Sequence, residues 1–212
     1  MTFHPTPRQL AFIKAAVFVL CLLPTARLLW RFATDSLGAN PIEYITRATG
    51  WWTLAFLAIT LAVTPARRWL SMPWLLRLRR MIGLFAFFQA CQHFTTYVWL
   101  DQFFDWTGIL ADIAKRPFVT VGFAAFMLLV PLAVTSTNAM VRRLGARRWQ
   151  GLHRLVYGIA VLGAIHFWWL VKKDITEPAV FATVIGLLLA SRLVGRPRAP
   201  SPGRPAPRPV SG

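Results

Sequence analysis

The segment FVTVGFAAFMLLVPLAVTS, residues 118–136, decides the fold because it carries no charged side chain over nearly the length of a membrane span. A helix needs about 20 consecutive apolar residues to cross the hydrocarbon core of a bilayer. Five more apolar stretches of similar length occur, at residues 11–30, 44–64, 81–100, 152–171 and 178–194. Because an α-helix satisfies its own backbone in lipid, we expect an all-α, polytopic membrane bundle of six transmembrane helices.

The composition supports a membrane protein. Hydrophobic residues make up 56% of the chain and charged residues only 15%, against about 25% in a typical soluble domain. The net charge is +17, but the basic residues stand in short clusters between apolar runs, so we expect no nucleic-acid binding. The two cysteines, Cys21 and Cys91, lie inside apolar runs and imply no disulfide framework.

The distribution of charge predicts the orientation in the membrane. Seventeen of the 24 basic residues fall on one side of the six-span arrangement, mostly in residues 65–80, 137–151 and the C-terminal tail. All seven acidic residues fall on the other side. The positive-inside rule therefore places both termini in the cytoplasm. We expect a cytoplasmic N-terminus at residues 1–10, a membrane domain at 11–194, and a disordered, Pro-rich and basic tail at 195–212.

Histidines inside the spans are the candidate functional residues, since ionisable groups within a membrane are costly. His93 lies 13 residues after Arg80, and His166 lies 13 residues after His153, each counted from the inner end of its span. Both should therefore lie about 20 Å along their helices, at a shared depth. Two facing imidazoles can hold a haem iron from both sides. Zinc is disfavoured because Cys91, the other possible ligand nearby, points away from His93.

His153 stands at the cytoplasmic edge of its span. A second bis-histidine site would need a ligand at the base of the third span, where the chain has Arg79 and Arg80. A guanidinium stays protonated and does not bind iron. We therefore predict that His153 is a secondary cofactor contact or an alternate iron ligand. Arg79 and Arg80 could pair with haem propionates or a flavin phosphate, or could act only in setting the topology.

Other chemistries have little support in the sequence. There is no G-x-G-x-x-G fingerprint, so electrons must come from a donor partner. Catalytic triads and paired carboxylates are absent from the spans, which predicts an electron carrier without its own substrate-reducing site. A histidine-lined transporter or proton pathway is an alternative, although every acid lies at the outer side. Another is an assembly subunit whose histidines only bond between helices.

Several strings of residues resemble one family. They are RRMIGL at 79–84 followed by His93 and Tyr97, KRPF at 115–118, TSTNAM at 135–140, LGARRWQGLHRLVY at 144–157, and IH at 165–166. Together they resemble the MsrQ-type haem-binding membrane subunits of periplasmic protein-methionine-sulfoxide reductase systems, within the ferric-reductase-like transmembrane family.

The resemblance implies a multi-pass protein of the bacterial inner membrane that contains haem b and FMN. It also implies electrons arriving from a cytoplasmic flavin reductase or the quinone pool. They would leave for a periplasmic molybdopterin-containing methionine sulfoxide reductase subunit. The chain departs from the wider family's two-haem pattern at Arg79 and Arg80, so the number of haems stays open.

Overall fold

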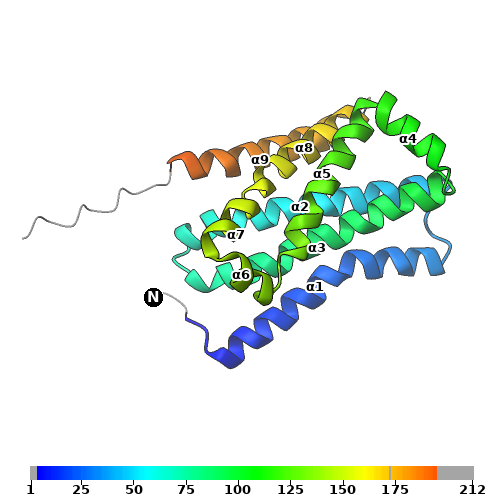
Figure 1. Cartoon of the computed structure of the whole chain (residues 1–212). Helices are drawn as coiled ribbons and strands as arrows, with labels where there is room; N and C mark the ends of the chain where they lie inside the picture. The colour runs from blue at the N-terminus through cyan, green and yellow to red at the C-terminus, as the bar shows by residue number, and fades with distance from the viewer. Residues whose placement is uncertain (1–3, 172, 195–212) are drawn as a thin grey trace, which may run out of the picture.

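The computed structural model describes residues 4–171 and 173–194, and the basic tail predicted to be disordered lies outside this range. Every regular element within the described residues is helical, which confirms the all-α prediction. The long helices run between the same two ends of the bundle (Figure 1). They are α1 (Pro7–Ala33), α2 (Pro41–Trp69), α3 (Leu76–Thr95), α5 (Pro117–Val134), α8 (Leu155–Leu170) and α9 (Thr176–Val194).

The shorter elements lie at the ends of the bundle. The 3-10 turn η1 (Pro73–Leu75) leads into α3, and α6 (Asn138–Leu144) and α7 (Ala146–His153) lie at the same end of the bundle (Figure 1). At the opposite end, the π-helical segment η2 (Thr96–Asp101) extends α3, and α4 (Trp106–Lys115) connects it to α5. The first end carries the arginine clusters, and the second carries the acids of α4 and of the turn before α9.

Local sequence explains where the helices begin. Thr6 and Gln9 form a capping box ahead of Pro7, whose missing N–H costs nothing in the first turn of α1. The carboxylate of Asp105 accepts from the hydroxyl of Thr107 and the backbone N–H groups of Thr107 and Gly108 at the start of α4. These bonds hold the pKa of Asp105 below its usual value. The N-terminus of α4 is thereby fixed at the acidic end of the bundle.

Three of the described helices, α1, α2 and α5, are long and apolar enough to cross a membrane by length and composition. Among the other expected spans, α8 has only 16 residues and α3 begins in an arginine cluster. Large apolar side chains such as Phe12, Phe32 and Leu187 are more than 60% exposed. Exposure on this scale suits a lipid environment. The crossing of all six helices and the cytoplasmic termini stay predictions.

The core lies where α2 packs on α3 and α5 packs on α8. Leu61 of α2, Ala86 of α3 and the adjacent pair Ile159 and Ala160 of α8 are completely buried. Helix α9 covers α2 and α8, whereas α1 packs mainly along α3, with Arg31 lying over the ring of Tyr44 on α2. Small residues at these contacts let helix backbones approach closely, as is typical of membrane bundles.

The prediction of one continuous helix over residues 152–171 is wrong. The chain ends α7 at His153 and begins α8 at Leu155. Around this break the N–H of Arg154 bonds the carbonyl of Gly151, and the N–H of Tyr157 bonds the carbonyl of Arg154. These three-residue hydrogen bonds tighten the backbone into a turn. His153 and His166 consequently belong to different helices.

Candidate functional site

His93 of α3 and His166 of α8 face each other inside the bundle. Their ring centroids are 6.1 Å apart, and their planes are inclined at 81°. The spacing along the sequence predicted that these two imidazoles would share one depth, and the structure brings them together. Their role as iron ligands stays a prediction.

The environment of His93 fixes which of its two ring nitrogens carries the hydrogen. Its Nδ1 lies 2.9 Å from the backbone carbonyl oxygen of Thr46 on α2. A carbonyl oxygen only accepts, so Nδ1 carries the hydrogen and the lone pair of a neutral ring is on Nε2. The hydroxyl of Thr49 donates to the carbonyls of Ile45 and Thr46 and lies 3.5 Å from the same Nδ1. Helix α2 therefore orients His93 through its backbone.

The environment of His166 repeats this arrangement on another helix. Its Nδ1 donates to the carbonyl oxygen of Phe118 on α5, at 2.7 Å. Both histidines therefore hold Nδ1–H against a backbone carbonyl and keep Nε2 for a ligand. Metal-binding histidines in proteins usually have their other nitrogen bonded in this way.

The pair has the dimensions of an axial ligand set. An imidazole nitrogen binds a first-row metal at about 2 Å, so two rings on opposite sides of one ion have centroids about 6 Å apart. The observed separation is 6.1 Å. Within the part of the chain that the structure describes, no three His, Cys, Asp or Glu side chains gather to hold a metal ion. Two protein ligands fit a metal whose remaining positions are filled by a porphyrin.

Aromatic side chains pack between α3, which carries His93, and α5, which carries the carbonyl acceptor of His166. Phe94, next to His93, stacks on Phe126 of α5 with centroids 4.7 Å apart. Phe126 in turn stacks on Phe87 of α3 at 6.1 Å, with planes inclined at 8°. Such apolar rings exclude water and lower the local dielectric around a cofactor.

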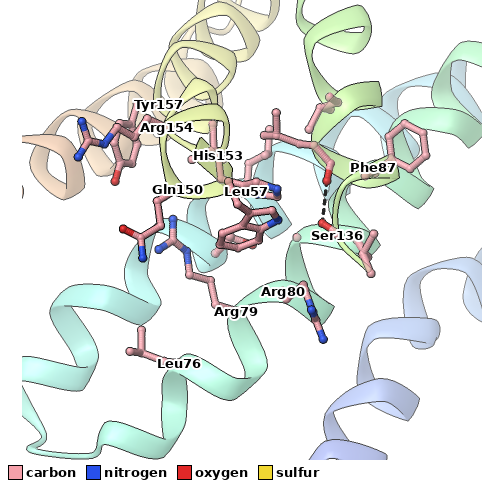
Figure 2. Close-up of a pocket in the computed structure, with 18 residues that line it drawn as sticks. Leu57, Leu76, Arg79, Arg80, Phe87, Ser136, Gln150, His153, Arg154 and Tyr157 are labelled. Carbon is pink, nitrogen blue, oxygen red and sulfur yellow. Dashed lines mark hydrogen bonds between the residues drawn. The ribbon is translucent and has the colours of Figure 1, made fainter. Parts of the chain in front are cut away.

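A second candidate site lies at the arginine-rich end of the bundle. It is a cavity of about 390 Å³ between α2, α3, α5, α7 and α8. That volume is in the range of small-molecule sites. Its lining includes Arg79, Arg80 and Arg154 and no carboxylate, so it is suited to an anion. In Figure 2, Arg79 extends toward Gln150 and His153, whereas Arg80 extends away from them.

His153 lines this cavity and is held differently from the other two histidines. Trp149 stacks on its ring, with centroids 3.9 Å apart. The hydroxyl of Thr135 donates to the carbonyl of Pro131 at 2.6 Å and lies 3.1 Å from His153 Nε2. Because the hydroxyl already donates its hydrogen to Pro131, it can only accept from His153 Nε2–H. Nδ1 of His153 is then the ring nitrogen with a free lone pair.

The structure thus separates the candidate residues into two groups. It brings His93 to His166 at one site, and it brings Arg79 to His153 at the other, with Arg80 at the edge of the cavity. The sequence prediction missed the carbonyl acceptors of Thr46 and Phe118, because every residue has a carbonyl. Its only available signal was the isolated glycine four residues after each of them, Gly50 and Gly122.

Comparison with known proteins points to one family. Residues 49–164 match the family described as ferric reductase like transmembrane component. The chain is 60% identical to the protein-methionine-sulfoxide reductase heme-binding subunit MsrQ of Herminiimonas arsenicoxydans, over 91% of this chain and 89% of that protein. It is 54% identical to the protein of the same name from Azospira oryzae, over 98% of this chain and 90% of the relative. Rhodospirillum rubrum has another such relative, 57% identical over 90% of this chain and 92% of its own length.

Proposed function

The chain belongs to the ferric-reductase-like transmembrane family, and on that premise we propose that it is the haem-binding membrane subunit of a protein-methionine-sulfoxide reductase system. In this proposal His93 and His166 hold haem b, and the chain carries electrons from the cytoplasmic to the periplasmic side of the inner membrane. The observation that carries the proposal is the facing pair of imidazoles, each with Nδ1 bonded to a backbone carbonyl.

The residues of the chain have defined tasks in this function. A bound haem supplies one-electron chemistry, which no side chain of the chain offers by itself. Thr46 and Phe118 orient the two imidazoles, and the stacked rings of Phe87, Phe94 and Phe126 add apolar surface between α3 and α5. The chain binds and shields the redox group, and substrate chemistry belongs to a partner.

The partners follow from the family resemblance. Electrons arrive from a cytoplasmic flavin reductase or the quinone pool. They leave for a periplasmic molybdopterin-containing subunit that reduces methionine sulfoxide. The acidic end of the bundle, with α4, faces the periplasm in this orientation, and the arginine-rich end faces the cytoplasm.

We assign the arginine-rich cavity to a second cofactor contacted by His153 and Arg79, with Arg80 lining the edge of the cavity and extending away from His153. The family resemblance supplies FMN as a candidate, and a second haem is the other. Both carry anionic groups, a phosphate or propionates, that an arginine can bind through paired hydrogen bonds. The size of the cavity, its arginines and the open Nδ1 of His153 support this assignment.

The test is the haem content of protein purified in detergent. We expect b-type bands in a dithionite-reduced minus oxidised spectrum, quantified by pyridine haemochrome. His93→Ala and His166→Ala should each remove the haem of the paired site. His4→Ala, in the N-terminal segment, is the matched control. A wild-type protein without haem after expression with haem supplementation would contradict the proposal and favour the transporter or assembly alternatives.

A further inference from the structure

Two glycines occupy equivalent positions beside the paired histidines. A Cβ built on Gly50 of α2 would lie 3.1 Å from Cε1 and 3.2 Å from Nδ1 of His93. A Cβ built on Gly122 of α5 would lie 2.7 Å from Nδ1 and 2.8 Å from Cε1 of His166. The second pair of distances is shorter than a real Cβ tolerates, so alanine at 122 requires the ring to move.

Each glycine also lies one helical turn after the carbonyl that accepts from the same ring. Thr46 precedes Gly50 by four residues, and Phe118 precedes Gly122 by four. In an α-helix the carbonyl of residue i−4 points toward residue i, and the Cα–Cβ bond of residue i tilts back toward it. A side chain at either glycine would therefore cover the oxygen that the imidazole reaches.

We propose that Gly50 and Gly122 are positioning residues for the haem ligands, each exposing one helical carbonyl to the Nδ1–H of the facing histidine. This inference rests on the proposed function only in that the two histidines hold the haem. The carbonyl has two lone pairs, so it serves the helix and the imidazole together.

The hydrogen bond from Nδ1–H to the exposed helical carbonyl has a chemical consequence at both histidines. It fixes the tautomer in which Nε2 faces the iron, and it fixes the rotation of each ring about its Cα–Cβ axis. Donation from Nδ1 to a carbonyl makes the imidazole a more basic ligand. A more basic imidazole ligand would stabilise ferric over ferrous iron, so the two glycines would hold the midpoint potential of a bound haem low.

Other helical glycines of the bundle do not share this geometry. A Cβ on Gly158 of α8 or Gly186 of α9 would meet nothing within 4 Å. A Cβ on Gly83 of α3 would make ordinary contact with the side chain of Thr60, at 3.7 Å. Among the described glycines, the close approach to an imidazole is thus confined to Gly50 and Gly122.

The experiment compares Gly122→Ala and Gly50→Ala with Gly83→Ala and Gly158→Ala as matched controls, in full-length protein purified in detergent. Three quantities are measured: haem per protein, the ferric spin state by electron paramagnetic resonance, and the midpoint potential. We expect Gly122→Ala to weaken haem retention by about tenfold, as loss of a ligand's supporting contact does in other sites. Gly50→Ala, with the smaller overlap, should keep its haem but show a higher midpoint potential.

The outcomes separate the inference from the proposed function. Haem and potential unchanged in Gly122→Ala and Gly50→Ala, alongside a haem-containing wild type, would overturn the inference and leave the proposed function standing. Equal losses in all four variants would also overturn it, because they would indicate general sensitivity of the helices. A wild type without haem would instead contradict the proposed function. If Gly122→Ala does not fold, judged by size exclusion, the potential of Gly50→Ala decides.

Discussion

The indole of Trp149 stacks on the imidazole of His153, with ring centroids 3.9 Å apart and planes inclined at 27°. The same indole donates from Nε1 to the carbonyl of Thr135 at 2.8 Å, while the hydroxyl of Thr135 lies 3.1 Å from His153 Nε2. These three residues therefore join α7 to the C-terminal end of α5. They form a closed set of contacts at the arginine-rich cavity.

The variant Trp149→Phe tests the hydrogen bond to Thr135 apart from the stacking on His153. Phenylalanine keeps an aromatic ring on His153 but leaves the carbonyl of Thr135 without its side-chain donor. We expect a loss of about 1 kcal/mol of unfolding free energy, the usual net value of one such bond. Thermal unfolding in detergent measures it, with Trp69→Phe, 77% exposed, as the control. Equal shifts in the two variants would contradict a specific role for the bond.

Arg192 makes a polar link between α9 and the rest of the bundle. Its guanidinium donates to the hydroxyl of Tyr157 at 2.7 Å and to the carbonyl of Leu61 at 2.8 Å. It also lies over the Tyr157 ring, 4.7 Å from the centroid. One charged side chain thus connects α9 to α8 and α2.

Tyr157→Phe tests this link without changing the ring. The variant retains the cation–π contact but removes the acceptor of a charge-assisted hydrogen bond, which contributes about 1.5–3 kcal/mol. We expect a lower unfolding temperature and unchanged haem at the His93–His166 pair. Arg192→Lys should also lower the unfolding temperature, because an ammonium cannot reach both partners with the geometry of a guanidinium. A Tyr157→Phe protein as stable as wild type would show that the ring contact alone suffices.

The sequence predicted the proximity of His93 and His166 because depth along a helix follows directly from residue spacing. It did not predict the break at Arg154, where a turn forms within the run Leu152 to Leu155. The turn starts at Gly151, but one glycine inside an apolar run does not by itself predict a break in a helix. His153 is therefore held by α5 and by its own short helix rather than by the helix of His166.

The backbone acceptors at Thr46 and Phe118 could not be read from residue types, since all carbonyls are alike in a sequence. An isolated glycine inside a span indicates that another group approaches the helix closely, but it does not identify that group.

The prediction of the membrane spans is similarly incomplete. Charge clustering and apolar length predicted six spans, and α1, α2 and α5 satisfy length and composition by themselves. For α3, α8 and α9, crossing of the membrane stays a prediction.

Helix α1 is joined to α3 by a small polar cluster within the apolar region. Gln89, only 1% exposed, donates to the hydroxyl of Thr25 at 3.0 Å. Gln92 donates to the same hydroxyl at 3.2 Å. Beside this cluster, the ring of Phe18 lies edge-on to Phe85 of α3, with centroids 5.2 Å apart. The Thr25 hydroxyl therefore adds a polar link to the apolar packing that holds α1 on α3.

Thr25→Val keeps the shape of the side chain and removes the shared acceptor. Interhelical hydrogen bonds of this kind contribute about 0.6–2 kcal/mol in membrane proteins. We expect α1 to become more accessible, seen as faster labelling of the buried Cys21 thiol by a maleimide, with the haem of the His93–His166 pair retained. Thr34→Val, at the exposed end of α1, is the control. Labelling at the wild-type rate in Thr25→Val would contradict the prediction.

Variants of Arg79 and Arg80 test whether these arginines bind a cofactor or only set the membrane topology. Both lie on α3 and line the cavity, but only Arg79 extends toward His153 (Figure 2). If the arginines act only in orienting the helix, Arg79→Gln and Arg80→Gln remove one charge each and should behave alike. If Arg79 binds an anionic cofactor through its fork of donors, we expect Arg79→Gln to lower the cofactor content about tenfold, and Arg79→Lys to restore it only in part. Flavin fluorescence and pyridine haemochrome on the purified variants measure both cofactors, and Arg80→Gln should stay near wild type. Equal cofactor contents in the two glutamine variants would leave topology as the role of both arginines.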